Sequence, residues 1–332
     1  MALNYDSISS VVQSDLLPKM VDNITEKSAF LSMMLMDGRT MSAAGRMSQG
    51  TRGNLQVLVP LRYQLGTAVG TYSDYDTIDL TPADPRTAAA FDLANYYATI
   101  SISQTDELKV SGDNAVIQLL TDEMEVAELT LKKRLYQDIF SGSGSNSLVG
   151  LDTAIGTGTY GGIAGATYTW WNSTVDATAH TAANMIDSTS TSYILALLRN
   201  GYDACSHMGE KPNLILVTQR VFDILEQVAD TDVQFTVPTT GRAQKVASLG
   251  FNTIVWRNIP IVVDDTINET AHPMYMINTN YLTLYYHPDN NFKFHPFAEP
   301  VNQFSRHAKI TFSGQLAIEN RRMFYRWSDL NN

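Results

Sequence analysis

The sequence has almost no cysteine, no long apolar run and little positive charge. Its only cysteine among 332 residues is Cys205, which excludes an internal disulfide framework and any cysteine cluster for zinc or iron–sulfur. No uninterrupted apolar stretch approaches the roughly 18 residues needed to cross a bilayer. The N-terminal MALNYDSISS lacks the basic start and apolar stretch of a signal peptide. We therefore expect a chain that is made in a cytoplasm and has no membrane segment.

The shortage of positive charge argues against a dedicated nucleic-acid-binding protein. The formal net charge is -11, whereas binding through phosphate contacts needs clustered Lys and Arg. A protein that only encloses DNA needs no such cluster. Residues 142–290 hold thirteen acidic against six basic residues, and residues 291–332 hold three against six. Opposite charges on these segments could attract each other between subunits, at about 0–1 kcal/mol per exposed pair.

The sequence also lacks a convincing constellation for cofactor binding. Gly156-Thr-Gly158-Thr-Tyr-Gly161 matches GxGxxG, with Asp176 beyond it. A dinucleotide site needs a strand before the motif and a helix after it, but a Thr/Trp-rich stretch follows here. We therefore predict no cofactor.

Candidate catalytic groups are equally sparse. Cys205 and His207 could suggest a nucleophile and a base, but on a predicted helix over 191–207 they point in different directions, which favours a core thiol. Asp264 and Asp265 end a strand, where acidic residues commonly begin a turn. The histidines show no metal-ligand spacing; they are His180, His207, His272, His287, His295 and His307. We predict that the chain is not an enzyme and binds no metal.

Residues 1–50 carry a broken helical pattern that ends in a Met-rich cluster near Met33 to Met36. This apolar segment has no obvious core of its own. Two alternatives remain open: a helical hairpin packed on its own subunit, or an arm lying on a neighbouring copy.

A long insert separates two predicted strands. Residues 55–61 and 93–103 alternate between apolar and polar positions, as strands do. The insert between them contains Asp74, Asp76, Asp79 and Asp84 and few core-forming residues. It should therefore form a long hairpin that projects from the body, and a loop of that length usually has a function.

The clearest element is a helix over residues 113–140. Apolar residues recur there at spacings of three and four, which gives a helix about 40 Å long with one apolar face. Asp113 can cap it, and acidic side chains precede basic ones along it, as the helix dipole favours. Residues 141–190 are rich in Gly, Ser, Thr and Ala, and we expect aromatic anchors there, namely Tyr160, Tyr168, Trp170 and Trp171.

The second half reads as an α/β lobe. The helix over 191–207 leads into the buried strand LILVT, and Thr218 caps a helix over QRVFDILEQ. Four short strand-like segments follow, FNTIVW, IPIVVDD, MYMIN and YLTLYYH. Long strands over FKFHPFAEP and AKITFSGQLAIENRRMFYRW should form a second sheet packed on the long helix.

In this order the elements resemble the major capsid proteins of tailed phages, over essentially the whole chain. The more specific segments are SNSLVGLDTAI at 145–155, KPNLILVTQRVFDILEQ at 211–227, and FNTIVWRNIPIVVDDTI at 251–267 followed by MYMINTNYLTLYYHP at 274–288. The resemblance implies an α+β Hong Kong 97-type phage capsid fold. Its expected parts are an N-terminal arm (1–50), an extended loop with its returning strand (51–108), a peripheral domain with a long spine helix (109–141), an α/β axial domain (142–290) and the closing strands of the peripheral domain (291–332).

The resemblance implies a structural protein of the virion that assembles in the bacterial host cytoplasm. Pentamers and hexamers of the chain would form an icosahedral shell around double-stranded DNA, with a portal protein as a partner. In this family the extended loop rests on a neighbour's peripheral domain. The hypothesis follows that Asp74, Asp76, Asp79 and Asp84 face basic residues of a neighbour, namely Lys293, Arg306, Arg321, Arg322 and Arg326.

Two departures from the family matter. Some relatives join subunits by an isopeptide bond from a lysine in the loop, but residues 28–108 contain no lysine. We therefore expect non-covalent contacts or a cement or decoration protein. Only about fifty residues precede the loop, so we expect a separate scaffolding protein or a direct assembly route. An encapsulin-like compartment shell, or an enzyme with an unrecognised site, are the alternative functions.

Overall fold

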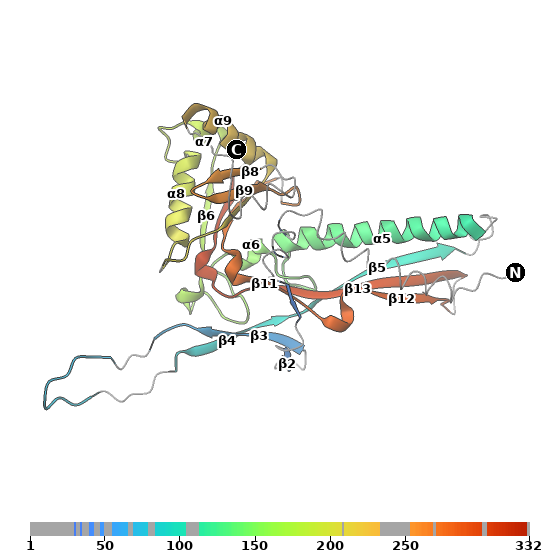
Figure 1. Cartoon of the computed structure of the whole chain (residues 1–332), viewed down its shortest axis with the longest axis horizontal. Coiled ribbons are helices and arrows are strands. Elements are labelled where there is room, and N and C mark those ends of the chain that lie inside the picture. The colour runs from blue at the N-terminus through green and yellow to red at the C-terminus, as the bar shows by residue number, and fades with distance from the viewer. Residues whose placement is uncertain are drawn as a thin grey trace.

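The computed structural model describes residues 30, 34, 40–42, 47–49, 55–65, 69–78, 84–103, 113–207, 209–232, 253–267, 270–300 and 304–330. These residues form an elongated body built on a five-stranded sheet, a second body built on a six-stranded sheet, and a hairpin that extends away from both (Figure 1). A small sheet of β2 (Met47–Gln49), β3 (Leu55–Arg62) and β4 (Arg86–Asp92) forms the base of the hairpin.

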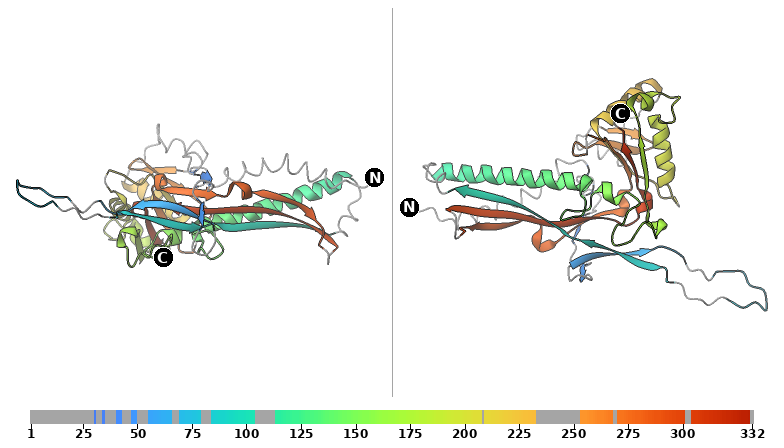
Figure 2. Two further views of the ribbon diagram at one scale, coloured as in Figure 1. Left: turned by 90° about the horizontal axis from the view of Figure 1, so that it is seen from below. Right: turned by 180° about the vertical axis from the view of Figure 1, so that it is seen from behind.

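The elongated body is a long helix lying on long strands, as the sequence predicts. Helix α5 (Asp113–Ser141) runs along β5 (Ala94–Ser103) and β13 (Ser305–Ile318), as the views in Figure 2 show. The predicted apolar face is buried wherever its side chains are described: Met124, Ala127, Leu131, Leu135 and Ile139 are at most 6% exposed. The period of 3.6 residues places them in one row, and packing on the sheet keeps that row from water.

Strand β13 is the central strand of the first sheet. It pairs along one edge with β5 over ten residues, and along the other with β12 (Lys293–Ala298) and then with β11 (Leu282–Tyr286). All three pairings are antiparallel, and β1 (Thr40–Ser42) adds a parallel edge beside β11. These pairings confirm the predicted strand over 93–103. Of the predicted closing strands, β12 and β13 lie in this sheet, whereas Tyr325–Asp329 joins the second sheet.

The second body has the strand order β6-β14-β10-β7-β9-β8. Its strands are β6 (Thr174–Ala179), β14 (Tyr325–Asp329), β10 (Met274–Ile277), β7 (Leu214–Val217), β9 (Ile259–Val263) and β8 (Thr253–Trp256). Its helices are α7 (Ala182–Ile186), α8 (Ile194–Cys205) and α9 (Gln219–Asp232). The predicted helix over 191–207 is thus shorter, and His207 lies beyond its end in a bridge with Glu210.

The central strands of this sheet are apolar without alternation because both of their faces are covered. In β7, Ile215 and Val217 pack with the helices, whereas Leu214 and Leu216 join the core shared with the elongated body. All four are fully buried. Side chains alternate between faces along a strand, so a continuous apolar run is expected only where both faces are buried.

The chain crosses between the two sheets differently from the predicted boundary at residue 290. Strand β11 lies before that boundary but pairs with β13 in the first sheet. Strand β14 lies after it but pairs with β10 and β6 in the second. The crossing occurs at the short 3-10 helix η6 (Arg321–Met323), between β13 and β14. Local sequence pattern identifies a strand but not the sheet that it joins.

The predicted N-terminal arm lies mostly outside the described residues. Where it is described, it packs on its own subunit: Phe30 and Met34 are fully buried, and the Phe30 ring lies 5.9 Å from that of Phe140. Strand β2 (Met47–Gln49) pairs with β3 (Leu55–Arg62) of the hairpin.

Candidate functional site

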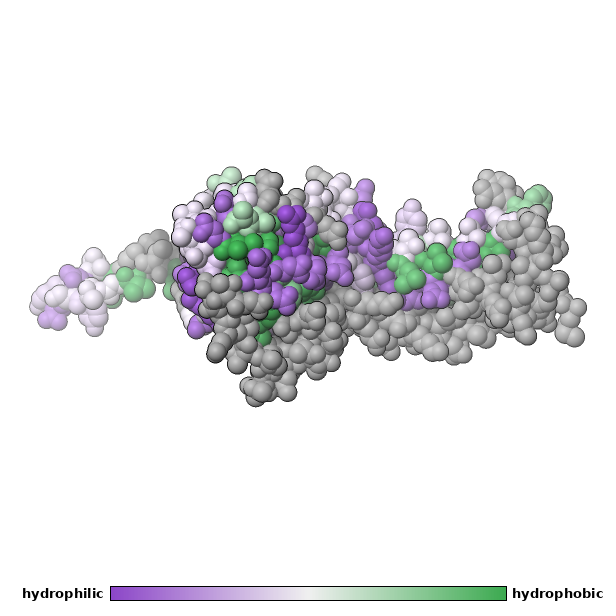
Figure 3. Space-filling view, turned by 90° about the horizontal axis from the view of Figure 1, so that it is seen from above, coloured by the Kyte–Doolittle hydropathy of each residue, from purple (hydrophilic) through white to green (hydrophobic). Residues whose placement is uncertain are grey.

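The β3–β4 hairpin exposes apolar surface that would serve no purpose in a compact monomer. Strands β3 and β4 (Arg86–Asp92) pair in antiparallel register from Gln56–Asp92 to Arg62–Arg86. Beyond them the chain leaves the body, and Figure 3 shows hydrophobic among hydrophilic residues on this projection. Five large apolar side chains there are between 68% and 100% exposed: Leu65, Val69, Tyr72, Tyr75 and Ile78. Exposed apolar residues gathered on one projection are typical of an interaction surface.

Two of the predicted acidic residues lie at the far end of this hairpin. Asp74 and Asp76 are exposed, and Oδ2 of Asp76 accepts a hydrogen bond from the Ser73 amide at 2.9 Å. Asp84 instead lies at the root, where its carbonyl oxygen accepts a hydrogen bond from the Tyr63 hydroxyl at 2.7 Å. Asp79 lies outside the described residues.

The predicted basic partners occupy three different environments. Lys293 and Arg322 are exposed. Arg306 and Arg326 form ion pairs within their own subunit, Arg306 with Glu299 at 2.7 Å and Arg326 with Asp152 at 2.9 Å. The structure therefore does not gather the five basic residues into one patch.

Arg321 is fully buried, which removes it from the set of residues that a neighbour could contact. Its guanidinium donates hydrogen bonds to the carbonyl oxygens of Ala154 (2.8 Å), Gly156 (2.6 Å) and Gly158 (3.2 Å). Its Cζ lies 5.0 Å from the centre of the Tyr160 ring and 5.8 Å from that of Trp171. Burial lowers the pKa of Arg321 to about 10.

The carbonyl oxygens of the GxGxxG segment thus accept hydrogen bonds from an arginine of the same chain. It follows the four-residue helix α6 (Leu151–Ala154), with no strand before it. Gly156 and Gly158 present carbonyl oxygens to Arg321, whereas a dinucleotide site presents amide hydrogens to phosphate.

The other candidate groups have environments that suit structural residues. Cys205 is fully buried, and burial raises the pKa of its thiol to about 12, which suits a core residue rather than a nucleophile. Oδ1 of Asp264 accepts hydrogen bonds from the amide and the hydroxyl of Thr266, as a residue that begins a turn does. Within the described ranges, no three His, Cys, Asp or Glu side chains lie close enough to hold a metal ion, and no helix is long and apolar enough to cross a bilayer.

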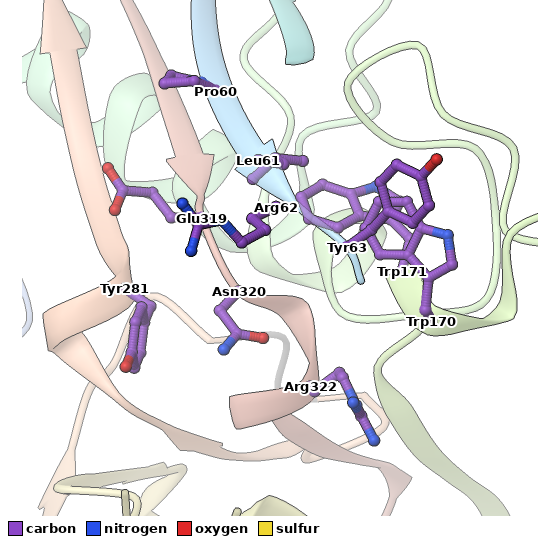
Figure 4. Close-up of a pocket in the computed structure, with 10 residues that line it drawn as sticks. All are labelled: Pro60, Leu61, Arg62, Tyr63, Trp170, Trp171, Tyr281, Glu319, Asn320 and Arg322. Atoms are coloured by element: carbon purple, nitrogen blue, oxygen red, sulfur yellow. The ribbon is translucent and has the colours of Figure 1, made fainter. Parts of the chain in front are cut away.

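A cavity of about 360 Å³ lies at the root of the hairpin (Figure 4). Its walls come from β3, the aromatic 3-10 helix η3 (Thr169–Trp171), Tyr281 and the segment around η6. Tyr63 stacks on Trp170 with ring centres 5.2 Å apart. Two arginines line the opening, Arg62 and Arg322, together with Glu319. The sequence predicts Trp170 and Trp171 as anchors and Arg322 as a contact. For Arg62 its only signal is the position where a strand meets a long loop, and it was not predicted.

Known proteins match this chain in its fold but not in its sequence. No protein-family model matches the sequence, and no curated protein does. Solved structures match across nearly the whole chain. The capsid protein of cyanophage A-1(L) matches with a TM-score of 0.54 at 16% identity, over 88% of this chain and 90% of that one. That of a native GTA particle matches with a TM-score of 0.57 at 12% identity, over 83% and 85%. That of Myoviridae phage XM1 matches with a TM-score of 0.56 at 10% identity, over 90% and 92%.

The chain has the Hong Kong 97-type capsid fold. This confirms the fold predicted from the order of the elements. We propose that α5 is the long spine helix of that fold and that the β3–β4 hairpin is its extended loop. By the same proposal, the body around β13 is the peripheral domain, and the six-stranded sheet with α7, α8 and α9 is the axial domain.

Proposed function

We propose that this chain is the major capsid protein of a tailed phage. Pentamers and hexamers of it form an icosahedral shell around double-stranded DNA, in a virion that is assembled in the cytoplasm of the bacterial host. A portal protein, a separate scaffolding protein and a cement or decoration protein are the further partners that we propose. The chain has no enzymatic role in this proposal.

The observation that carries the proposal is the projecting hairpin on a capsid fold. Five large apolar side chains on it are more than two-thirds exposed, and Tyr75 is completely exposed. Burying apolar surface contributes about 25 cal/mol per Å², so covering these side chains with a neighbouring copy favours assembly. The negative net charge fits a shell that encloses DNA without binding it through a basic cluster.

We also propose contacts between the extended loop and a neighbour's basic residues, with fewer basic residues than the sequence predicts. Asp74 and Asp76 are at the exposed end of the loop, and Lys293 and Arg322 are the exposed members of the basic set. Arg306 and Arg326 could join only by exchanging or sharing their present carboxylate partners. Reversing the charges of Arg321 and Arg322 together would not test this contact, because a glutamate buried in place of Arg321 would itself disrupt the subunit.

The test is whether the purified protein assembles, by sedimentation and negative-stain electron microscopy, alone and with scaffolding candidates. We expect closed shells or ring-shaped capsomers. A matched variant replaces Val69, Tyr72, Tyr75 and Ile78 by Ser; it should fold with an unchanged circular dichroism spectrum and fail to form particles, because these side chains contribute little to the monomer core. A wild-type protein that stays monomeric under every condition contradicts the proposal, and shells that enclose an enzyme would favour an encapsulin-like compartment.

A further inference from the structure

The cavity at the root of the extended loop has the features of a prepared binding site. Trp171 is only 2% exposed, and its Nε1 donates a hydrogen bond to the Tyr160 carbonyl at 3.0 Å. Tyr63 is held by its stacking on Trp170 and by its hydroxyl bond to Asp84. The aromatic wall therefore keeps its shape without an occupant, which lowers the entropic cost of binding.

The chemistry of the cavity favours an aromatic group that is flanked by negative charge. Tyr63, Trp170 and Tyr281 offer ring surfaces, and Arg62 and Arg322 offer two guanidinium groups against the single carboxylate of Glu319. Figure 4 shows Tyr63 beside the two tryptophans and Tyr281 with Glu319 on the opposite side. A volume of about 360 Å³ is at the small end of ligand pockets, which suits one or two side chains rather than a domain.

The tip of the extended loop has the complementary chemistry. The segment Tyr72-Ser-Asp-Tyr-Asp76 alternates tyrosines, 77% and 100% exposed, with two exposed carboxylates. Building on the proposed capsid function, we propose that this tip of one copy occupies the root cavity of a second copy. Tyr75 enters between the aromatic walls, and Asp74 and Asp76 face Arg62 and Arg322.

The tip that enters the cavity must belong to another copy, because a loop cannot reach its own root. The hairpin ladder continues to the Arg62–Arg86 pair, and the Tyr63 amide donates a hydrogen bond to the Pro85 carbonyl at 3.1 Å. These bonds direct the tip away from the body in every view (Figures 1 and 2).

A second groove offers a direct alternative. It has a volume of about 370 Å³ and lies between β5 and α5, lined by Tyr97, Val126 and Arg134 among others. Its arginine is already paired with Asp138 at 3.1 Å, and Glu123 adds negative charge. Charge complementarity with Asp74 and Asp76 therefore favours the root cavity.

Paired cysteines distinguish the two sites in assembled particles. Ser73→Cys combined with Asn320→Cys leaves the proposed contact residues in place and should give disulfide-linked ladders of copies on a non-reducing gel, whereas either single variant should not. Cys205 can remain because it is fully buried. Ladders from Ser73→Cys with Tyr97→Cys, and none with Asn320→Cys, would overturn the proposal while leaving the capsid function intact.

Charge exchange tests the same contact without cysteines. Arg62→Glu with Arg322→Glu should lower particle yield roughly tenfold or more, and adding Asp74→Arg with Asp76→Arg should restore it. Unchanged yield from the arginine pair, or no restoration by the exchange, contradicts the docking of the tip. Failure of the wild-type chain to assemble would instead count against the proposed function.

Discussion

Arg321 and Arg322 are adjacent in the sequence and have opposite environments. Arg321 is fully buried against three carbonyl oxygens and two aromatic rings, whereas Arg322 is exposed at the opening of the root cavity. The buried arginine lies in η6, where the chain crosses from one sheet to the other, and it ties that crossing to the 154–158 segment. Of this pair, Arg321 therefore stabilises the inside of the subunit, whereas Arg322 supplies a charge on its surface.

Replacing Arg321 should destabilise the subunit. Arg321→Met keeps much of the side-chain length but leaves three buried carbonyl oxygens without their donor, so we expect a loss of roughly 3 kcal/mol in the free energy of unfolding. Urea unfolding of the dissociated subunit measures it. Arg322→Met is the matched control and should change stability by no more than about 0.5 kcal/mol. Equal losses in the free energy of unfolding from the two variants would contradict a stabilising role that is specific to Arg321.

At the scale of elements, helix α8 packs on β14 through a glycine. A Cβ atom on Gly201 would lie 2.3 Å from Cη2 of Trp327, which is fully buried. The glycine is therefore needed for close approach of helix and strand, although glycine in a helix interior costs about 1 kcal/mol relative to alanine. Packing outweighs helix propensity at this position.

Gly201→Ala should consequently lower stability although alanine is the better helix former. Overlap with the indole should cost about 1–3 kcal/mol, more than the propensity gain. Asn200→Ala, on the exposed side of the same helix, is the control and should be neutral or stabilising by up to about 0.7 kcal/mol. Thermal unfolding of both variants checks the signs, and a higher Tm for Gly201→Ala would show that the helix can shift away from β14.

At the scale of the whole molecule, buried tyrosines make the subunit sensitive to alkali. Burial raises the pKa of Tyr136 and of Tyr325 to about 12, and it also raises the pKa values of Tyr96, Tyr160 and Tyr275 well above the usual range. The folded chain thus retains phenol protons that the unfolded chain releases near pH 10. This contribution is complete below about pH 10 and is lost as pH rises through the folded values. The lowered pKa of Arg321 acts in the opposite direction, but it is one group against five.

We therefore expect the Tm of the subunit to fall steeply above about pH 10. Tyr136→Phe removes one titrating phenol and should reduce the slope of Tm against pH in that range, which calorimetry at several pH values can measure. An unchanged slope in that variant, or a flat Tm profile in the wild type, would contradict the buried-phenol explanation.

Local patterns predicted the elements because their physical causes are local. The row of apolar residues from Met124 to Ile139 reports the helical period, and the unbroken apolar run in 214–217 reports a strand buried on both faces. The insert after Arg62 lacks residues that could form a core, so its projection could also be predicted. The order of these elements was sufficient to indicate the capsid fold.

The sequence by itself therefore determined the three longer helices, α5, α8 and α9, most strands, the projecting loop and the order in which they occur. Only the tertiary structure decided that β11 and β14 join sheets on opposite sides of the predicted boundary, that Arg321 is internal, and that Arg62 and Trp170 share a cavity. Those facts depend on contacts between residues far apart in the chain, where side chains compete for the same buried space. Periodicity within a segment records which face is apolar, but it does not record which distant segment covers that face.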